Sequence, residues 1–376
     1  MPPSNSTAVQ ATGKEDVAVE LDLPGQVQHT LTEYLQTRRA EAVGLDPAFA
    51  AAVAELSGFV LGGGKRIRPT FAWWGWRAAG GPAEGPPAQA MLRAASALEL
   101  LQACALVHDD LIDESDTRRG NPTVHRRFEQ IHRESGFSGG ATQFGLAAAV
   151  LLGDLALSWA DDMLHSAGIA PQALVRALRP WRAMRTEVLA GQYLDVLGQF
   201  RGDETPQAAL QICQLKAASY TVQRPLELGA EIAGAGPDAL QALRRFGSDI
   251  GVAFQLRDDL LGVFGDPEVT GKPAGDDLRE GKRTVLIAEA VAAARGQADQ
   301  PALDLLRDVL GDPELDADRV EQARQVLTRL GAVEAVEKRI TDLTGSAMLA
   351  LHTAGLAEPA ASRLAELAIA VTDRSH

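Results

Sequence analysis

Residues 98–113 read LELLQACALVHDDLID, an almost uncharged stretch that ends in three aspartates. Its apolar residues recur at three- and four-residue spacing and cover nearly every side of a helix, which is typical of a helix at the centre of a large bundle. Residues 147–164 have the same character. Two central helices of this kind favour an all-α fold.

The rest of the chain has the same helical periodicity from Gln26 onward. Strand signals are absent, the apolar residues are mainly Ala and Leu, and only 5% of the chain is aromatic. We therefore predict one all-α domain over residues 25–376, a single large helical bundle around a central cavity, after a disordered tail over residues 1–24. Breaks rich in Gly and Pro divide the bundle at residues 80–87, 133–142, 201–206, 234–237, 265–275 and 311–313.

Composition excludes several classes of protein. The net charge is −14, from 50 acidic and 36 basic residues, which argues against a nucleic acid as the main partner. The two cysteines, Cys104 and Cys213, lie in apolar helical surroundings and are predicted to be small core residues. We see neither a secretory signal nor a run of about 18 uncharged apolar residues, so the sequence predicts a cytoplasmic protein without a membrane span.

The three aspartates that end the first apolar stretch are candidate metal ligands. Asp109 and Asp113 are four residues apart, so their carboxylates share a helix face. With Asp110 between them, three acids at the end of an apolar helix repel and desolvate one another. A hard divalent cation relieves this repulsion, and Mg²⁺ prefers carboxylates together with substrate phosphate. The alternative at this point is a solvated helix end with ordinary surface acids.

A second acidic cluster follows about 150 residues later, where it can face the first across a cavity of the bundle. Carboxylates that hold a metal, interleaved with fixed cations, are an arrangement that binds a diphosphate. The members of this cluster are Asp258, Asp259, Asp266, Asp276 and Asp277, with Lys272 and Lys282 among them.

Basic residues gather in two further places. Lys65, Arg66 and Arg68 follow three glycines in the segment GGGKRIRP, and Arg118 and Arg119 follow the first acidic motif. Paired guanidinium groups suit phosphate oxygens, and glycines allow close approach of the backbone to a ligand. The alternative is that these cations pair with nearby acids.

Taken in order and at these separations, the motifs resemble those of the trans-isoprenyl diphosphate synthases, or polyprenyl synthetases, and within them the bacterial geranylgeranyl diphosphate synthases. The resemblance extends from about Gln26 to the C-terminus. It is carried by GGGKRIRP at 62–69, DDLID at 109–113, RRG at 118–120, GQYLD at 191–195, Lys216, QLRDD at 255–259, Gly271-Lys272 and Lys282.

The resemblance implies the isoprenoid synthase fold, a homodimer, and a head-to-tail condensation of isopentenyl diphosphate with an allylic diphosphate. The allylic diphosphate would sit on three Mg²⁺ ions, for which Mn²⁺ can substitute. Departure of its diphosphate would leave a carbocation. The double bond of isopentenyl diphosphate would attack that carbocation, and a proton would then pass to the departing diphosphate.

The resemblance also implies roles for single residues. Metal ligands would be Asp109, Asp113 and Asp258, supported through water or hydrogen bonds by Asp110, Asp195, Asp259 and Asp277. Allylic-diphosphate cations would be Arg118, Lys216, Lys272 and Lys282. The isopentenyl-diphosphate site would be Lys65, Arg68, Gln102 and Arg119, and Gln255 would orient the reacting groups.

Two positions depart from the family pattern. Gly262 stands where the second acidic motif has a third Asp, and Asp266 is not expected to replace it because Gly265 and Pro267 should end the helix. Ala217 follows Lys216 where Thr is usual, so one hydroxyl contact to the allylic substrate would be missing.

Product length in such enzymes depends on side chains one or more helical turns before the first Asp, which floor the tunnel for the growing chain. Cys104 and Ala105 are small, so no aromatic plug stops the chain at C15, and Leu101 one turn further is a medium stop. We predict a C20 product, leave C25 or longer open, and expect Cys104→Phe to give C15. The alternative is a floor on another helix or on the partner subunit.

Two other functions share some of these features. A type I terpene cyclase also has an all-α fold, an acidic motif and magnesium, but it needs no isopentenyl-diphosphate site of the kind that Lys65 and Arg68 suggest. A non-catalytic subunit of a heteromeric synthase would be expected to lose its acidic motifs, whereas Asp109 to Asp113 are intact.

Overall fold

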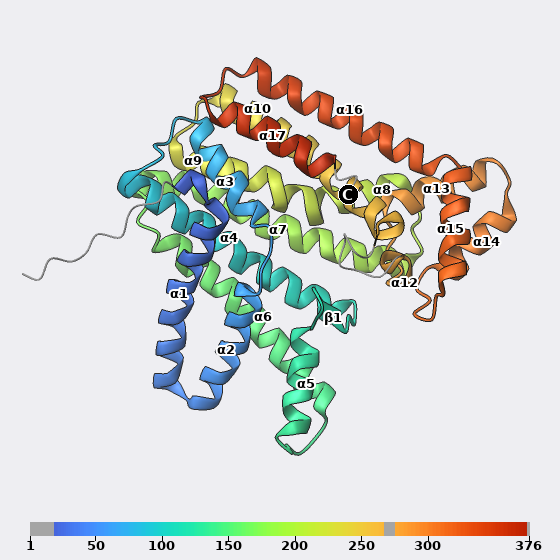
Figure 1. Cartoon of the computed structure of the whole chain (residues 1–376), viewed down its shortest axis with the longest axis horizontal. Helices are drawn as coiled ribbons and strands as arrows, with labels where there is room; N and C mark the ends of the chain where they lie inside the picture. The colour runs from blue at the N-terminus through green and yellow to red at the C-terminus, as the bar shows by residue number, and fades with distance from the viewer. Residues whose placement is uncertain (1–18, 267–274, 374–376) are drawn as a thin grey trace, which may run out of the picture.

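The structure is a computed structural model that describes residues 19–266 and 275–373, and it is built almost wholly of helices (Figure 1). The predicted all-α class is therefore confirmed. The N-terminal half contains the single turn η1 (Val19–Leu21) and the helices α1 (Leu23–Leu45), α2 (Pro47–Leu61), α3 (Ile67–Ala78), α4 (Gly85–Ile112), α5 (Val124–Glu134), α6 (Ala141–His165) and α7 (Pro171–Arg201).

The C-terminal half continues with helices and one wide-turned segment, the π-helix η2. Its elements are α8 (Pro206–Ile212), η2 (Cys213–Gln223), α9 (Arg224–Ala233), α10 (Pro237–Phe264), α12 (Asp276–Arg279), α13 (Val285–Gly296), α14 (Gln300–Val309), α15 (Ala317–Arg329), α16 (Ala332–Thr353) and α17 (Ala360–Thr372).

Helical structure begins earlier than the expected domain start at residue 25. Residues 1–18 lie outside the described residues, but Val19–Leu21 already form a turn, and Asp22 caps α1 through its side chain. Glu20 forms an ion pair with Arg77 of α3, which ties this turn to the bundle. The described part of the expected tail is thus ordered by a cap and a tertiary contact.

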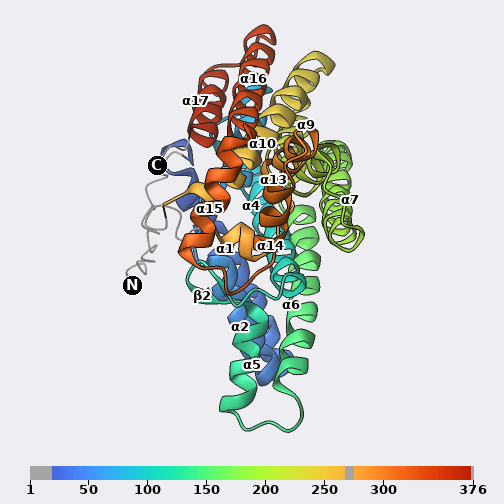
Figure 2. The same cartoon turned by 90° about the vertical axis from the view of Figure 1, so that its right-hand side faces the viewer.

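Helix α4 has the central place that its sequence predicts. Buried residues occur on all of its sides, and it packs against α1, α3 and α6 (Figure 1). Helix α6 does not fulfil the same prediction. It lies at the edge of the lower part of the molecule in Figure 2. Its side chains Phe144, Val150 and Leu151 are exposed. Apolar composition sets how much of a helix can be buried, but not what covers it.

By length and composition alone, α4 and α6 could each cross a membrane. In α4, 78% of the most apolar 18-residue stretch is buried inside the fold. In α6, only 28% of the corresponding stretch is buried. This is weak support for a span, because the core helices of globular proteins meet the same criterion.

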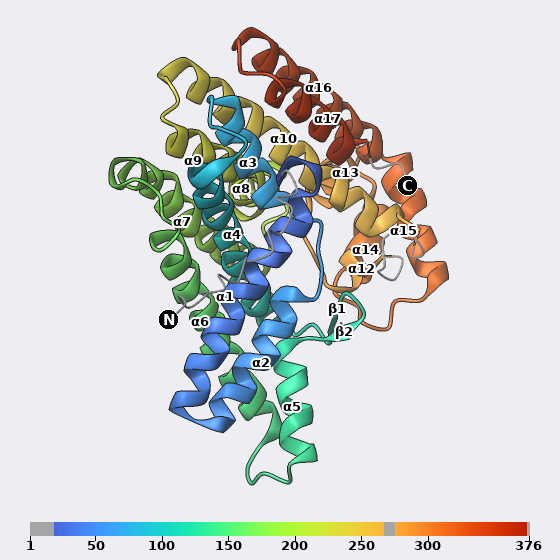
Figure 3. The ribbon, with the colours of Figure 1, turned by 60° about the vertical axis from the view of Figure 1, so that its left-hand side comes forward.

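The buried apolar residues form two clusters rather than the one core expected. The larger cluster joins α1–α7, η2, α9, α16 and α17, and the smaller joins η2, α8 and α12–α16, so η2 and α16 contribute to both. Helix α10 contributes its first half to the larger cluster and its second half to the smaller one. Figures 1 and 3 show α16 and α17 alongside α10, on the side of the molecule opposite α5.

One short hairpin follows α4 where no strand was expected. β1 (Thr117–Arg118) pairs antiparallel with β2 (Asn121–Pro122). Arg119 and Gly120 at its turn both have positive φ, 53° and 74°, which suits a two-residue hairpin turn. The hairpin holds Arg118 and Arg119 beside the acidic end of α4.

Candidate active site

The two acidic motifs line one cavity of about 690 Å³. Asp109 comes from α4, Asp195 from α7, and Asp258 and Asp259 from α10, so segments far apart in the sequence meet here. Lys216, from η2, lines the same cavity. The cavity therefore combines clustered carboxylates with a fixed ammonium group.

The ammonium of Lys216 bridges two of these carboxylates. Its Nζ lies 2.6 Å from Asp195 Oδ2 and 3.1 Å from Asp109 Oδ1. Burial lowers the pKa of Lys216, but the two carboxylates outweigh it and raise the pKa overall. Burial raises the pKa of Asp109, but Lys216 and Arg118 outweigh it and lower the pKa. Both groups are thus held in their charged forms.

Asp110 and Asp113 stand in different surroundings from Asp109. Asp110 is 1% exposed and accepts a hydrogen bond of 2.7 Å from Arg118 Nε. Its pKa is nevertheless raised, chiefly by burial. Burial, and next the charge of Asp109, raises the pKa of Asp113 to about 6. Arg118 pairs with acids in this structure, as the alternative interpretation of the basic residues held.

The surroundings of the second acidic motif disfavour ionised carboxylates even more than those of the first motif. Asp259 is buried, and burial together with the charge of Asp277 raises its pKa to about 8. Gln255 Nε2 donates a hydrogen bond of 2.8 Å to Asp259 Oδ1, which opposes that rise. Burial and neighbouring carboxylates thus disfavour the ionised form of Asp259 on this side of the cavity.

The departure at Gly262 has a structural explanation. A Cβ at this position would stand 1.9 Å from Asp277 Oδ2, so a side chain here would displace the Asp277 carboxylate from its place against α10. Helix α10 ends at Phe264, as predicted, and Asp266 lies beyond it. A carboxylate from α12 therefore lies beside the motif that lacks its third Asp.

Lys282 follows Asp277 and pairs with it. Its Nζ lies 3.3 Å from Asp277 Oδ1, and it also pairs with Glu280. Burial lowers the pKa of Lys282, but these two carboxylates outweigh it and raise the pKa. Lys272, the other cation predicted here, lies outside the described residues.

The segment GGGKRIRP separates its three cations. Lys65 is exposed and lines the cavity. The guanidinium of Arg66 pairs with Glu99 and donates to Gln28, as in the alternative in which these cations pair with nearby acids, and Arg66 also lines the cavity. Arg68 stacks over the ring of Tyr220 at 3.9 Å.

Arg68 also donates a 3.0 Å hydrogen bond to Thr221, while its buried Nε has no hydrogen-bond partner. Gln102 and Arg119 line this cavity and a neighbouring one of about 640 Å³. Arg119 donates a 2.6 Å hydrogen bond to the Gly63 carbonyl. Burial, and next the charge of Arg118, lowers the pKa of Arg119.

The three predicted chain-length residues do not share one environment. Ala105 lines the cavity. Leu101 and Cys104 are 2% and 4% exposed but are not among the cavity-lining residues. The thiol of Cys104 lies 3.7 Å from His108 Nδ1.

Among the cavity-lining residues that sequence reasoning missed are Tyr220, Thr221 and Gln192. Tyr220 and Thr221 hold Arg68, and Gln192 lines the cavity with a buried Nε2 that has no hydrogen-bond partner. Gln192 belongs to the GQYLD motif and could have been chosen from it. Tyr220 and Thr221 carried no signal, because their position depends on the wide turn of η2.

The acidic groups suit a divalent cation. The buried Asp110 Oδ2 has no hydrogen-bond partner, and burial, followed by neighbouring carboxylates, raises the pKa values of Asp113 and Asp259. In residues 19–266 and 275–373, no three Asp, Glu, His or Cys side chains form a closed metal site. Oxygen atoms of a bound diphosphate would complete the ligand set, as is common for Mg²⁺.

Comparison with known proteins decides the family. The family model for polyprenyl synthetases matches residues 51–327. The chain belongs to the polyprenyl synthetase family. It is thus a trans-prenyltransferase, a trans-prenyl diphosphate synthase of the isoprenoid synthase fold, which sets it apart from the type I terpene cyclases.

Three relatives illustrate the range of this family. The crystal structure of geranylgeranyl pyrophosphate synthase from Corynebacterium glutamicum, complexed with isoprenyl diphosphate and magnesium, is 45% identical with a TM-score of 0.89, over 93% of this chain and 98% of that one. A geranylfarnesyl diphosphate synthase from Aeropyrum pernix is 32% identical over 284 residues, 74% of this chain and 80% of its own length. A (2E,6E)-farnesyl diphosphate synthase from Mycobacterium bovis is 32% identical over 320 residues, 83% of this chain and 80% of its own length.

Proposed function

We propose that this prenyltransferase condenses isopentenyl diphosphate with an allylic diphosphate to make geranylgeranyl diphosphate, C20. The observation that carries the reaction is the cavity in which Lys216, Asp109 and Asp195 face the acids of α10. The C20 length is supported by the small side chain of Ala105 in that cavity and by the magnesium-bound geranylgeranyl pyrophosphate synthase at 45% identity.

In this proposal Asp109, Asp113 and Asp258 hold three Mg²⁺ ions, for which Mn²⁺ can substitute. When bound, Mg²⁺ stabilises the charge on the departing diphosphate. The buried carboxylates of Asp110 and Asp259 fix the surrounding groups by accepting hydrogen bonds from Arg118 and Gln255 respectively. Asp195 holds Lys216, and Asp277 holds Lys282.

The fixed cations bind the two diphosphates. Lys216 and Lys282 both line the cavity and, with Arg118 and Lys272, contact the allylic diphosphate in this proposal. Isopentenyl diphosphate binds at the end of the cavity that the GGGKRIRP segment lines. Gln255 orients the reacting carbons. Its diphosphate contacts are Lys65, Arg68, Gln102 and Arg119.

The reaction is tested by incubating the purified protein with isopentenyl diphosphate and each of the C5, C10 and C15 allylic diphosphates, followed by mass spectrometry of the products. We expect extension to C20 with Mg²⁺ and none with EDTA, because the crowded carboxylates cannot hold a diphosphate without cations. Products that stop at C15 or pass C25 would contradict the proposed length. Absence of extension under all conditions would contradict the reaction.

Ala105→Phe is expected to change the main product from C20 to C15. A phenyl ring at this cavity-lining position fills space about one helical turn before Asp109, and one turn of about 5.4 Å spans roughly one isoprene unit. Product chain length from the C10 starter measures the change. A variant that still ends at C20 would contradict a tunnel floor on α4.

Cys104→Phe extends this test to a buried neighbour. We expect C15 from this variant as well if the tunnel continues down α4 beneath Ala105. A C20 product from Cys104→Phe, beside C15 from Ala105→Phe, would mean that the space beneath Ala105 is bounded by α7 or α10 rather than by Cys104. Val188 and Phe254 line the cavity from those two helices.

We also propose that the enzyme is a cytoplasmic homodimer without a nucleic-acid partner. The exposed apolar face of α6, with Phe144, Leu146, Val150 and Leu151, is suited to a second copy of this chain. The two described cysteines are free thiols, and both substrates are water-soluble diphosphates, which favours the cytoplasm. Sedimentation equilibrium tests the dimer, and a monomer at all concentrations would overturn it.

A further inference from the structure

The segment that carries Lys216 is a π-helix, a wide turn that is seldom stable by itself. Pro225 follows it within the first turn of α9. Proline lacks an N–H, and its ring collides with the carbonyl four residues earlier in an α-helix, here that of Thr221. Widening of the turn relieves this collision. An eleven-residue π-helix still needs tertiary contacts to persist.

Neighbouring helices approach this segment through glycines. A Cβ at Gly191 of α7 would stand 2.4 Å from the backbone nitrogen of Lys216. A Cβ at Gly251 of α10 would stand 2.6 Å from the carbonyl oxygen of Ala218. A Cβ at Gly247 would stand 2.7 Å from Gln223 Cα. Helices α7 and α10 thus press on η2 from two sides, and its register against them decides where Lys216 lies.

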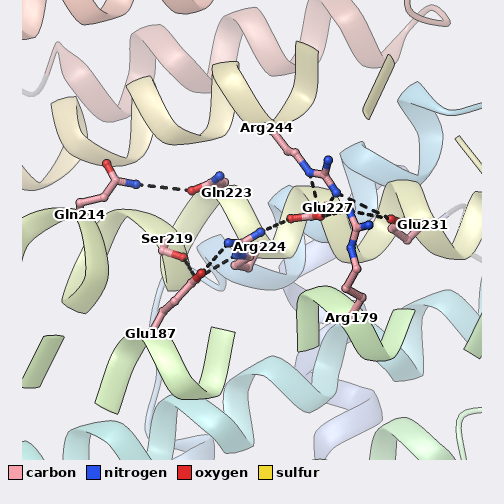
Figure 4. Close-up of polar contacts among 9 residues, drawn as sticks. All are labelled: Arg179, Glu187, Gln214, Ser219, Gln223, Arg224, Glu227, Glu231 and Arg244. Carbon is pink, nitrogen blue, oxygen red and sulfur yellow. Dashed lines mark hydrogen bonds and ion pairs between the residues drawn. The ribbon is translucent and has the colours of Figure 1, made fainter. Parts of the chain in front are cut away.

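Glu187 of α7 ties down the end of this segment (Figure 4). Its carboxylate accepts a hydrogen bond from Ser219, in the π-helix, and two from Arg224, the first residue of α9. Arg224 Nε lies 2.8 Å from Glu187 Oε2. One carboxylate therefore holds residues on both sides of the point where the π-helix becomes an α-helix.

Glu187 shares a helix face with the site. Glu187, Gly191 and Asp195 are spaced by four residues on α7, so they lie in one row along η2. The row contacts η2 through Ser219 at one end and Lys216 at the other. The same face of α7 therefore contacts both the end of η2 and Lys216, which lines the cavity.

Arg224 is itself held from the other side. It pairs with Glu227, which is 1% exposed and also accepts from Arg244 of α10. Figure 4 shows this chain of charges continuing to Arg179 and Glu231, away from η2. Gln214 and Gln223 add a hydrogen bond of 3.4 Å between the two ends of η2.

We propose that Glu187 is a positioning residue. By holding Ser219 and Arg224, it fixes the π-helical register that aims Lys216 at Asp109 and Asp195. The inference rests on the proposed role of Lys216 in binding the allylic diphosphate. A change from the i→i+5 hydrogen bonds of a π-helix to the i→i+4 bonds of an α-helix leaves fewer residues in each turn. Lys216 would therefore rotate about the helix axis relative to Arg224.

The test compares Glu187→Gln with Glu231→Gln, the same substitution at the far end of the same network. Glu187→Gln is expected to lower kcat/KM for the allylic substrate by about tenfold or more, since a displacement of about 1 Å in a catalytic group can cost a hundredfold. Glu231→Gln is expected to stay within about twofold, because Glu231 pairs with Arg179 and Arg244 rather than with η2, so Lys216 keeps its position. Ser219→Ala removes one hydroxyl and should give a smaller loss in the same direction.

Two further measurements separate positioning from general stability. In a Lys216→Ala background, Glu187→Gln should cost no further activity, since its effect acts through Lys216. Hydrogen exchange of residues 213–223 should accelerate in Glu187→Gln but not in Glu231→Gln. Additive losses in the double variant, or unchanged exchange and activity in Glu187→Gln, would overturn the inference. A fully active Lys216→Ala would instead overturn the proposed role of Lys216, and a wild type without condensation the proposed function.

Discussion

Replacement of Asp109 by Asn is expected to lower kcat/KM for chain extension by about three orders of magnitude, the scale of losing charge stabilisation at a reacting group. The variant keeps the shape of the side chain and removes its charge. Lys216 then loses one of its two carboxylate partners, and the cavity loses the carboxylate whose pKa is lowered by Lys216 and Arg118. The Asn amide cannot replace an anionic ligand for a divalent cation.

Steady-state rates with saturating Mg²⁺ measure this effect. Asp116→Asn is the matched control, because Asp116 lies just past the same motif, is 77% exposed, and pairs with Arg126 on the surface. We expect its activity to stay close to that of the wild type, while both variants keep the wild-type melting temperature. Activity of Asp109→Asn within tenfold of the wild type would rule out a central role for this carboxylate.

Replacement of Arg66 by Met is expected to lower the free energy of unfolding by about 3–5 kcal/mol, because it leaves a buried carboxylate without its partner. Arg66 and Glu99 are 6% and 4% exposed. Arg66 also donates to Gln28 and to the Val60 carbonyl at 3.1 Å, so the loss affects several elements. Arg66 has φ of 48°, a left-handed conformation that these contacts sustain.

Urea denaturation of paired variants measures this loss. Arg127→Met makes the same substitution at an exposed ion pair with Glu55, 38% and 36% exposed, and should cost about 1 kcal/mol or less. Adding Glu99→Leu to Arg66→Met should restore much of the stability, because no uncompensated charge then stays buried. Equal losses for the two Arg→Met variants would contradict the buried pair as the cause.

Much of the fold and of the site was predictable because it depends on local pattern. The helical periodicity gave the all-α class, and Gly265 gave the end of α10. Asp109 and Asp258, though 149 positions apart, were correctly expected near one cavity from the motif order. The central place of α4 followed from its apolar residues on every side.

The exceptions share one cause, which is that the sequence does not state what lies opposite a side chain. For Arg66 the sequence left open phosphate binding or pairing with an acid, and only the fold shows that Glu99 is its partner. Helix α6 is as apolar as α4, yet no described element covers its outer face. Cys104 and Ala105 are neighbours in sequence, but only Ala105 meets the cavity.

By itself, the sequence determined the helices, the chemistry of the acidic and basic motifs, and the family they belong to, because residue type and spacing along one helix set these properties. The tertiary structure alone decided that Asp277 fills the space left by Gly262, and that Glu187 holds the π-helix behind Lys216. Both contacts join residues on different helices. Their energies depend on distance and burial, which exist only once the helices have packed.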